Sequence, residues 1–149
     1  MNDEYFMRQA IVLAKEAAEE GEVPVGAVVV FDGKIVGKGR NRREISKNAL
    51  AHAEIEAINE ACRALGGWRL WQCDMYVTLE PCPMCTGAII NSRIKRLVYG
   101  ASDYKAGSCG SVVDLFSLPY NHKPEVVSGV MQEECAALLT DFFKKLRKK

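Results

Sequence analysis

Several features that would assign a protein class at once are missing from this sequence. Among 149 residues there are only two histidines, the formal net charge is +1, and no apolar run approaches the ~20 residues of a membrane span. Net charge therefore does not indicate a nucleic-acid-binding protein, and the sequence does not predict a membrane protein. Internal repeats, low-complexity tracts and linkers are also lacking. We expect one domain spanning residues 1–149, which is long enough to bury a sizeable core.

A second Cys-x-x-Cys pair is also lacking. Cys82 and Cys85 form such a pair, and the other cysteines occur singly, at positions 62, 73, 109 and 135. This arrangement does not supply the four clustered thiols of a four-cysteine zinc knuckle. Six cysteines with metal-type spacing, together with an acidic N-terminus (Met1–Glu4) that does not resemble a signal peptide, favour a reducing compartment over a disulfide framework. We therefore expect a cytoplasmic protein.

The segment His52-Ala53-Glu54 supplies the residue types that could complete a metal site with the cysteine pair. Structural zinc sites use four protein ligands, whereas catalytic sites use three and leave one position for water. His52, Cys82 and Cys85 supply three ligands, and Glu54 beside the histidine can move the protons of that water. These residue types predict a hydrolytic Zn²⁺ site with Glu54 as the catalytic acid and base.

Simpler interpretations exist for each part of this set. A Cys-x-x-Cys pair alone also fits a redox pair, half of a zinc knuckle or two buried thiols, and His52 alone fits a core histidine. The combination favours the metal site, because no second cysteine pair completes a knuckle and one of only two histidines stands two residues before a glutamate.

Hydrophobic periodicity predicts the secondary structure. Helices are expected at residues 3–20, 51–65, 83–91 and 131–146. Strands are expected at 25–31, 34–39, 75–79, 96–99 (ended by Gly100) and around 126–127. Asp32-Gly33 is a two-residue hairpin signal, and residues 41–50 and 106–111 are expected to be loops. The order of elements predicts an α/β fold in which helices cover a mixed sheet.

Spacing also bears on the geometry of the metal site. Cys82 and Cys85 lie three positions apart, so they share one face of a helix, and Pro83 suits the first turn of that helix. A thiol at a helix N-terminus is favoured as the thiolate that binds zinc. His52 and Glu54 are two apart and can face one metal only if the histidine lies at the start of its helix.

The His-x-Glu and Pro-Cys-x-x-Cys motifs resemble those of the cytidine-deaminase-like superfamily. Further segments resemble its bacterial tRNA-specific adenosine deaminases across nearly the whole chain: Gly21–Val28, Ala51–Glu54, Trp68–Leu70, Tyr76–Cys82, Tyr99–Ala101, Gly107–Gly110, Asn121–His122, Glu133–Cys135 and Asp141–Phe143. Cytidine, deoxycytidylate and guanine deaminases share the central motif, so the flanking segments carry the narrower resemblance.

That resemblance implies a three-layer α/β/α fold with a five-stranded mixed sheet, and a homodimer whose RNA site draws on both subunits. It implies that the wobble adenosine of a tRNA anticodon loop is hydrolysed to inosine, with ammonia released. By position, His52, Cys82 and Cys85 become the zinc ligands and Glu54 the proton carrier. The residues implied to contact RNA are Asn41, Asp103, Lys105, Asn121, His122, Phe143 and Arg147.

Two basic runs admit two interpretations. One comprises Arg40, Arg42, Arg43 and Lys47, and the other comprises Lys144–Lys149 without Leu146. Either run can be an ordinary solvated face or part of a phosphate-contacting surface. Two rival functions also stay open: a free-base or nucleotide deaminase, such as a guanine deaminase, and an RNA-binding or structural zinc module without catalysis.

Overall fold

A computed structural model describes residues 2–148, so Met1 and Lys149, the last residue of the basic C-terminal run, lie outside it. In chain order its elements are α1 (Asp3–Glu19), β1 (Gly26–Phe31), β2 (Lys34–Arg40), α2 (Ala53–Leu65), β3 (Cys73–Leu79), α3 (Pro83–Ser92), β4 (Arg96–Ala101), the 3₁₀ turn η1 (Leu115–Ser117), β5 (Glu125–Ser128) and α4 (Gln132–Arg147). None of the helices within residues 2–148 combines the length and apolar character needed to cross a bilayer.

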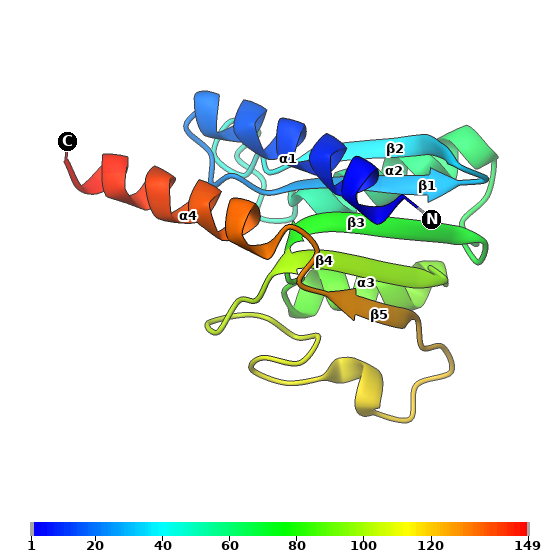
Figure 1. Cartoon of the computed structure of the whole chain (residues 1–149). Coiled ribbons are helices and arrows are strands. Elements are labelled where there is room, and N and C mark those ends of the chain that lie inside the picture. Colours follow the sequence, from blue (N-terminus) through cyan, green and yellow to red (C-terminus); the bar gives the residue numbers. More distant parts are fainter. Residues whose placement is uncertain (1, 149) are drawn as a thin grey trace.

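The strands form one mixed sheet in the order β2-β1-β3-β4-β5. Strand β1 pairs antiparallel with β2 and β3, whereas β3, β4 and β5 run parallel. The hairpin between β1 and β2 turns at Asp32 and Gly33, which both have positive φ (51° and 75°), as its sequence predicted. Helices α1 and α4 lie in front of the sheet and α2 and α3 behind it (Figure 1). The predicted three-layer α/β/α fold with a five-stranded mixed sheet is therefore confirmed.

Alternation along the strands divides the core between the two faces of the sheet. In β1 and β3, Val29 and Val77 pack with the cluster under α2 and α3, while Val28 and Tyr76 pack with the cluster under α1 and α4. Because β3 and β4 are buried on both faces, they read as nearly continuous apolar runs.

The bounds of some elements differ from those expected. Helix α2 begins at Ala53 rather than Ala51, because His52 has extended backbone (φ −83°, ψ 153°) and serves as the N-cap. Strand β3 begins at Cys73, which pairs with Phe31 of β1. Gly100 does not end β4: the strand continues to Ala101, paired with Leu79, and a side chain at Gly100 would collide with Cys135 of α4.

At two glycines of β2, the backbone of helix α2 packs directly on the backbone of the strand. A Cβ built on Gly37 would collide with the carbonyl oxygen of Ala57, and one built on Gly39 would collide with that of Ala53. This backbone contact fixes the depth and angle of the first turn of α2. It therefore also fixes the position of His52, the residue before that turn.

At the opposite end of the sheet, Arg96 joins distant parts of the chain. Its guanidinium donates to Asp3 at 2.7 Å and to Glu125 at 2.9 Å, and lies 3.8 Å from Asp74. The hydrogen bond from Arg96 lowers the pKa of Asp3, and the hydroxyl of Tyr76 donates to the same carboxylate at 2.7 Å. The start of α1 is thereby fixed to β3, β4 and β5.

We predict that Gly39→Ala lowers the free energy of unfolding by about 1–3 kcal/mol, because the new methyl group must push α2 away from β2. Thermal or urea denaturation measures the change. Gly67→Ala is the matched control, since a Cβ there meets no atom within 4 Å, and it should change stability by less than about 0.5 kcal/mol. Equal stability of the two variants would contradict the proposed close packing.

Candidate active site

Two helix N-termini meet at the predicted site. His52 is the N-cap of α2 and Cys82 is the N-cap of α3, both with extended backbone. Pro83 occupies the first turn of α3, as expected, and its fixed φ suits a helix start. Glu54 and Cys85 lie within the first turns of their helices and are both buried. The requirement that His52 lie at the start of its helix is thus met.

The three predicted ligands converge closely. Nδ1 of His52 lies 3.6 Å from Sγ of Cys82 and 3.5 Å from Sγ of Cys85. Zinc bonds of about 2.3 Å to sulfur and about 2.0–2.1 Å to nitrogen, arranged tetrahedrally, require an S···N separation of about 3.6 Å. The ligand atoms all lie within 4.8 Å of one another. This donor set fits zinc. Within residues 2–148 the group contains three ligands, which is the number that catalytic zinc sites use.

The electrostatics of the cluster favour thiolate ligands. Hydrogen bonds from Cys85 and His52 lower the pKa of Cys82 to about 4. The same contact with Cys82, together with burial, raises the pKa of Cys85, while the bond to Cys82 raises the pKa of His52. One thiol is thus poised as a thiolate, and a divalent cation would favour loss of the second proton.

Glu54 is the buried acid of the site, with only 4% of its surface exposed. Burial raises its pKa to about 7, against a smaller opposing effect of its own backbone hydrogen bond. It is not one of the three candidate ligands, although its carboxyl group hydrogen-bonds with the thiol of Cys85. A carboxyl group with a pKa near neutrality can accept a proton and release it again, as general acid–base catalysis requires.

A pocket of about 200 Å³ opens beside the cluster. This is smaller than the ~300–1,000 Å³ pockets that enclose drug-sized ligands, so it suits one planar ring better than a whole nucleotide. Its lining residues are Val23, Val25, Asn41, Arg43, His52, Ala53, Glu54, Leu79, Glu80, Cys82, Asp103 and Ala106. The pocket therefore brings an apolar wall, polar groups and the metal-binding cluster together.

Two of the residues expected to contact RNA lie in this pocket. Asn41 is buried, donates from Nδ2 to the carbonyl of Val23 at 3.2 Å, and accepts from the amide of Arg43 at 3.4 Å. Asp103 accepts from the amides of Lys105 and Ala106 at 3.0 and 3.3 Å, which shapes the turn on the facing side.

The other expected contacts lie outside the pocket. Lys105 is exposed on the turn after Asp103. Phe143, 41% exposed, and Arg147 lie on α4. Asn121 is exposed, and His122 donates from Nε2 to the carbonyl of Ile94 at 2.7 Å, just before β4 begins and therefore at the opposite end of that strand from Asp103. The structure does not bring Asn121 and His122 to the pocket, and their RNA contacts stay predictions.

The basic loop divides into residues with different partners. Arg40 is paired with Glu20 at 2.8 Å and approaches Glu16 at 3.9 Å, so its charge supports α1. Arg43 lines the pocket, whereas Lys47 is exposed. The run is thus neither one solvated face nor one phosphate-contacting surface.

Two buried acids were not singled out from the sequence. Glu22 and Glu80 are 1% and 2% exposed, and Glu80 lines the pocket. Glu80 directly follows an apolar strand and precedes Pro81-Cys82, which is a usable sequence signal for a buried acid beside the metal ligands. Glu22 carries no comparable signal, because it follows two other glutamates at a helix end.

A family model described as MafB19-like deaminase matches residues 1–147. A tRNA-specific adenosine deaminase of Bacillus subtilis is 51% identical over 99% of this chain and 92% of its own length. A tRNA-specific adenosine deaminase of Haemophilus influenzae is 50% identical over 97% of this chain and 85% of its own. The chain therefore belongs to the MafB19-like deaminase family, alongside these tRNA-specific enzymes.

Solved structures agree with this assignment. One from a study of A-to-I editing by tRNA:A34 deaminases at the wobble position superposes with a TM-score of 0.88 at 48% identity, over 91% of this chain and 99% of the other. A guanine deaminase of Bacillus subtilis gives a TM-score of 0.68 at 34% identity, and the superposition covers 100% of this chain and 96% of the other. The tRNA deaminase structure is the more similar of the two in both fold and sequence.

We predict one zinc ion per chain, measured by elemental analysis of the purified protein. Cys82→Ser/Cys85→Ser should lose the metal, because two of the three ligands are removed. Glu54→Ala is the control and should keep the metal, since Glu54 stands outside the ligand group. Full zinc occupancy in the double variant would show that the metal is held elsewhere.

Proposed function

We propose that this chain catalyses hydrolytic deamination of the wobble adenosine in a tRNA anticodon loop, giving inosine and ammonia. The observation that carries the proposal is a base-sized pocket that holds a His-Cys-Cys cluster and a buried glutamate, in a chain about half identical to tRNA-specific adenosine deaminases. We also propose that residues 1–149 act as one deaminase domain and that the protein works in the cytoplasm.

Zinc held by His52, Cys82 and Cys85 would lower the pKa of a bound water toward about 7 and so supply a nucleophile. Glu54 takes a proton from the water and delivers protons to a ring nitrogen and then to the departing amine. A carbon–oxygen bond forms at C6 of adenine, the bond from C6 to its amino nitrogen breaks, and ammonia leaves.

The pocket walls position the base for this step. Asn41 uses one hydrogen of its amide group on Val23, which leaves the second free to bind a base. The apolar wall formed by Val23, Val25 and Leu79 provides a surface for the ring. A loop base suits such a pocket, because it costs less to unstack than a base in a duplex.

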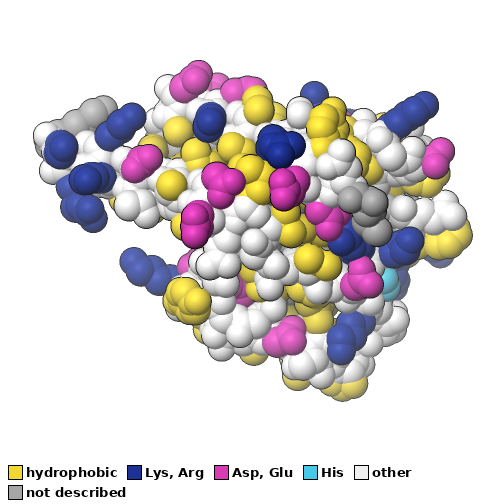
Figure 2. Space-filling model, viewed as in Figure 1, with side chains coloured by type: hydrophobic (Ala, Val, Ile, Leu, Met, Phe, Trp, Pro, Cys, Tyr) yellow, Lys and Arg dark blue, Asp and Glu magenta, His cyan; other side chains and the backbone are white. Residues whose placement is uncertain are grey.

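Positive charge near the pocket supports an RNA substrate. Arg43 lines the pocket, the exposed Lys105 lies two residues after Asp103, and basic side chains gather at the free end of α4, seen at the left of Figure 2. Lys144, Lys145 and Arg147 belong to that group. Such clusters attract phosphates, which RNA carries and a neutral free base lacks. We infer that Phe143 and Arg147 contribute to the same surface.

The direct test is inosine formation in an anticodon stem-loop that carries a wobble adenosine. We expect turnover of this RNA, with little on free adenosine, guanine or cytidine, because the surrounding loop supplies the phosphate contacts. Glu54→Ala should bind the stem-loop as well as the wild type does but lose turnover by at least about 10²-fold. Efficient guanine or cytidine turnover with no reaction on the RNA would instead assign a small-molecule deaminase.

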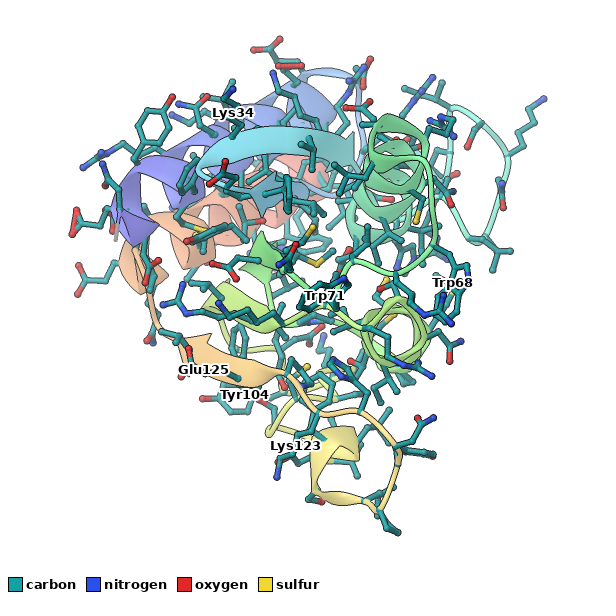
Figure 3. The ribbon with its side chains drawn as sticks, turned by 90° about the vertical axis from the view of Figure 1, so that its right-hand side faces the viewer. Lys34, Trp68, Trp71, Tyr104, Lys123 and Glu125 are labelled. Atoms are coloured by element: carbon teal, nitrogen blue, oxygen red, sulfur yellow. The ribbon has the colours of Figure 1, made fainter. Side chains whose placement is uncertain are left out.

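We also infer a homodimer. The resemblance implies it, and a groove between α2 and α3 supports it: Ile58, Ala88 and the half-exposed Trp68 line that groove. Trp68 lies at the edge of the molecule in Figure 3. We predict that sedimentation at micromolar concentration shows twice the 16.5 kDa chain mass. Replacing Trp68 by a charged residue should shift the distribution toward monomer. A monomer for the wild type would contradict the inference.

A further inference from the structure

We propose that two buried carboxylates, Glu22 and Glu80, are positioning residues that hold the two loops on opposite sides of the pocket mouth. They do so by accepting backbone N–H groups from those loops. The effect of these residues on kinetics rests on the proposed deaminase function. Their effect on the loops can be measured without substrate.

Glu80 holds the loop that follows β4. One carboxylate oxygen accepts from the amide of Asp103 at 3.0 Å and from the hydroxyl of Ser111 at 2.5 Å. The other accepts from the amides of Cys109 and Ser111 at 3.0 and 3.1 Å. In all four hydrogen bonds the loop donates and the carboxylate accepts. The donors span residues 103–111, so one side chain fixes both ends of this loop.

The loop wraps the carboxylate without an intervening side chain. A Cβ built on Gly107 would collide with the carboxyl carbon of Glu80 and with the carbonyl of Asp103. The amide of Gly107 also donates to that carbonyl at 2.8 Å. The glycine therefore lets the turn close around the acid, and Asp103 and Ala106 are held where they line the pocket.

Glu22 does the same for the loop that follows β2. Its two oxygens accept from the amides of Glu44 and Ile45 at 3.1 and 2.7 Å. This loop carries Asn41 and Arg43, which line the pocket opposite Asp103. Glu22 itself precedes Val23, whose carbonyl accepts from Asn41, so the acid and the base-contacting amide are tied to the same short segment.

Within the described part of the chain, neither of these two buried carboxylates is paired with a cation. Among the ion pairs formed within residues 2–148, none includes Glu22 or Glu80. Burying a carboxylate without a cation is costly unless hydrogen bonds satisfy its oxygens. Here the loop amides satisfy them, so each loop and its acid stabilise one another. The width of the pocket mouth is then set by two carboxylates that do not touch the ligand cluster.

Hydrogen exchange of individual amides tests the structural part. In Glu80→Gln the side-chain NH₂ group replaces one of the two accepting oxygens, so a donor then faces the donors of the loop. The amides of Asp103, Cys109 and Ser111 should therefore exchange at least about tenfold faster than in the wild type. Glu22→Gln should accelerate Glu44 and Ile45 instead. Ser111→Ala, which removes one of four donors, is a milder variant and should accelerate the same three amides by a smaller factor.

Kinetics on the stem-loop test the positioning role. We expect Glu80→Gln and Glu22→Gln to raise KM by about tenfold while kcat falls by less than about threefold, with the zinc content unchanged. Asp3→Asn is the matched control, because it removes an acid at the other end of the sheet and lowers stability without touching either loop. It should leave KM and the five loop amides unchanged.

Unchanged exchange at the loop amides in both glutamine variants and in Ser111→Ala would overturn the proposal, whatever the activity. Faster exchange with KM unaltered would overturn the positioning role. If the wild type does not act on the stem-loop, the proposed function fails, and the exchange data still decide whether the carboxylates hold the loops.

Discussion

The close contact between α2 and β2 is the constraint on which the site depends. Because Gly37 and Gly39 present no side chains, the first turn of α2 lies directly on the backbone of an edge strand. The sheet then fixes the end of β3, from which Glu80 and Pro81 lead into α3. Two helix starts are thereby brought together, with the His52 nitrogen at distances from the two sulfurs that suit one zinc ion.

Helix starts suit this chemistry for an electrostatic reason. The free amides and dipole at each N-terminus favour negative charge nearby, so a thiolate at the cap of α3 is stabilised before any metal arrives. Burial raises the pKa of Glu54 toward neutrality. The two groups differ because their surroundings differ: Cys82 is half-buried at a helix end, where hydrogen bonds lower the pKa of its thiol, whereas Glu54 is enclosed.

Much of this arrangement could be predicted from sequence. Periodicity located the helices and strands to within a few residues, and the motifs identified the cluster of His52, Cys82 and Cys85 because the sequence has a single Cys-x-x-Cys pair and a single His-x-Glu. Strand order could not be predicted, since pairing between distant strands leaves no local pattern. The loop-holding roles of Glu22 and Glu80 were also hidden, because hydrogen bonds to backbone amides do not depend on which residues donate them. Arg40 was grouped with its basic neighbours, although its actual partners, Glu16 and Glu20, lie in the last turn and at the C-cap of α1.

The position of α4 has a consequence for synthesis of the chain. Cys135 and Leu138 of this last helix complete the apolar cluster that begins with Met7 and Ile11 on α1. Arg96 likewise finds its partner Glu125 only near the end of the chain. A nascent polypeptide leaving the ribosome must therefore carry an open front layer until the residues from Glu125 onward emerge. The rear layer, which carries the His52–Cys82–Cys85 cluster, can assemble earlier, so a group able to hold a metal can form before the fold is complete.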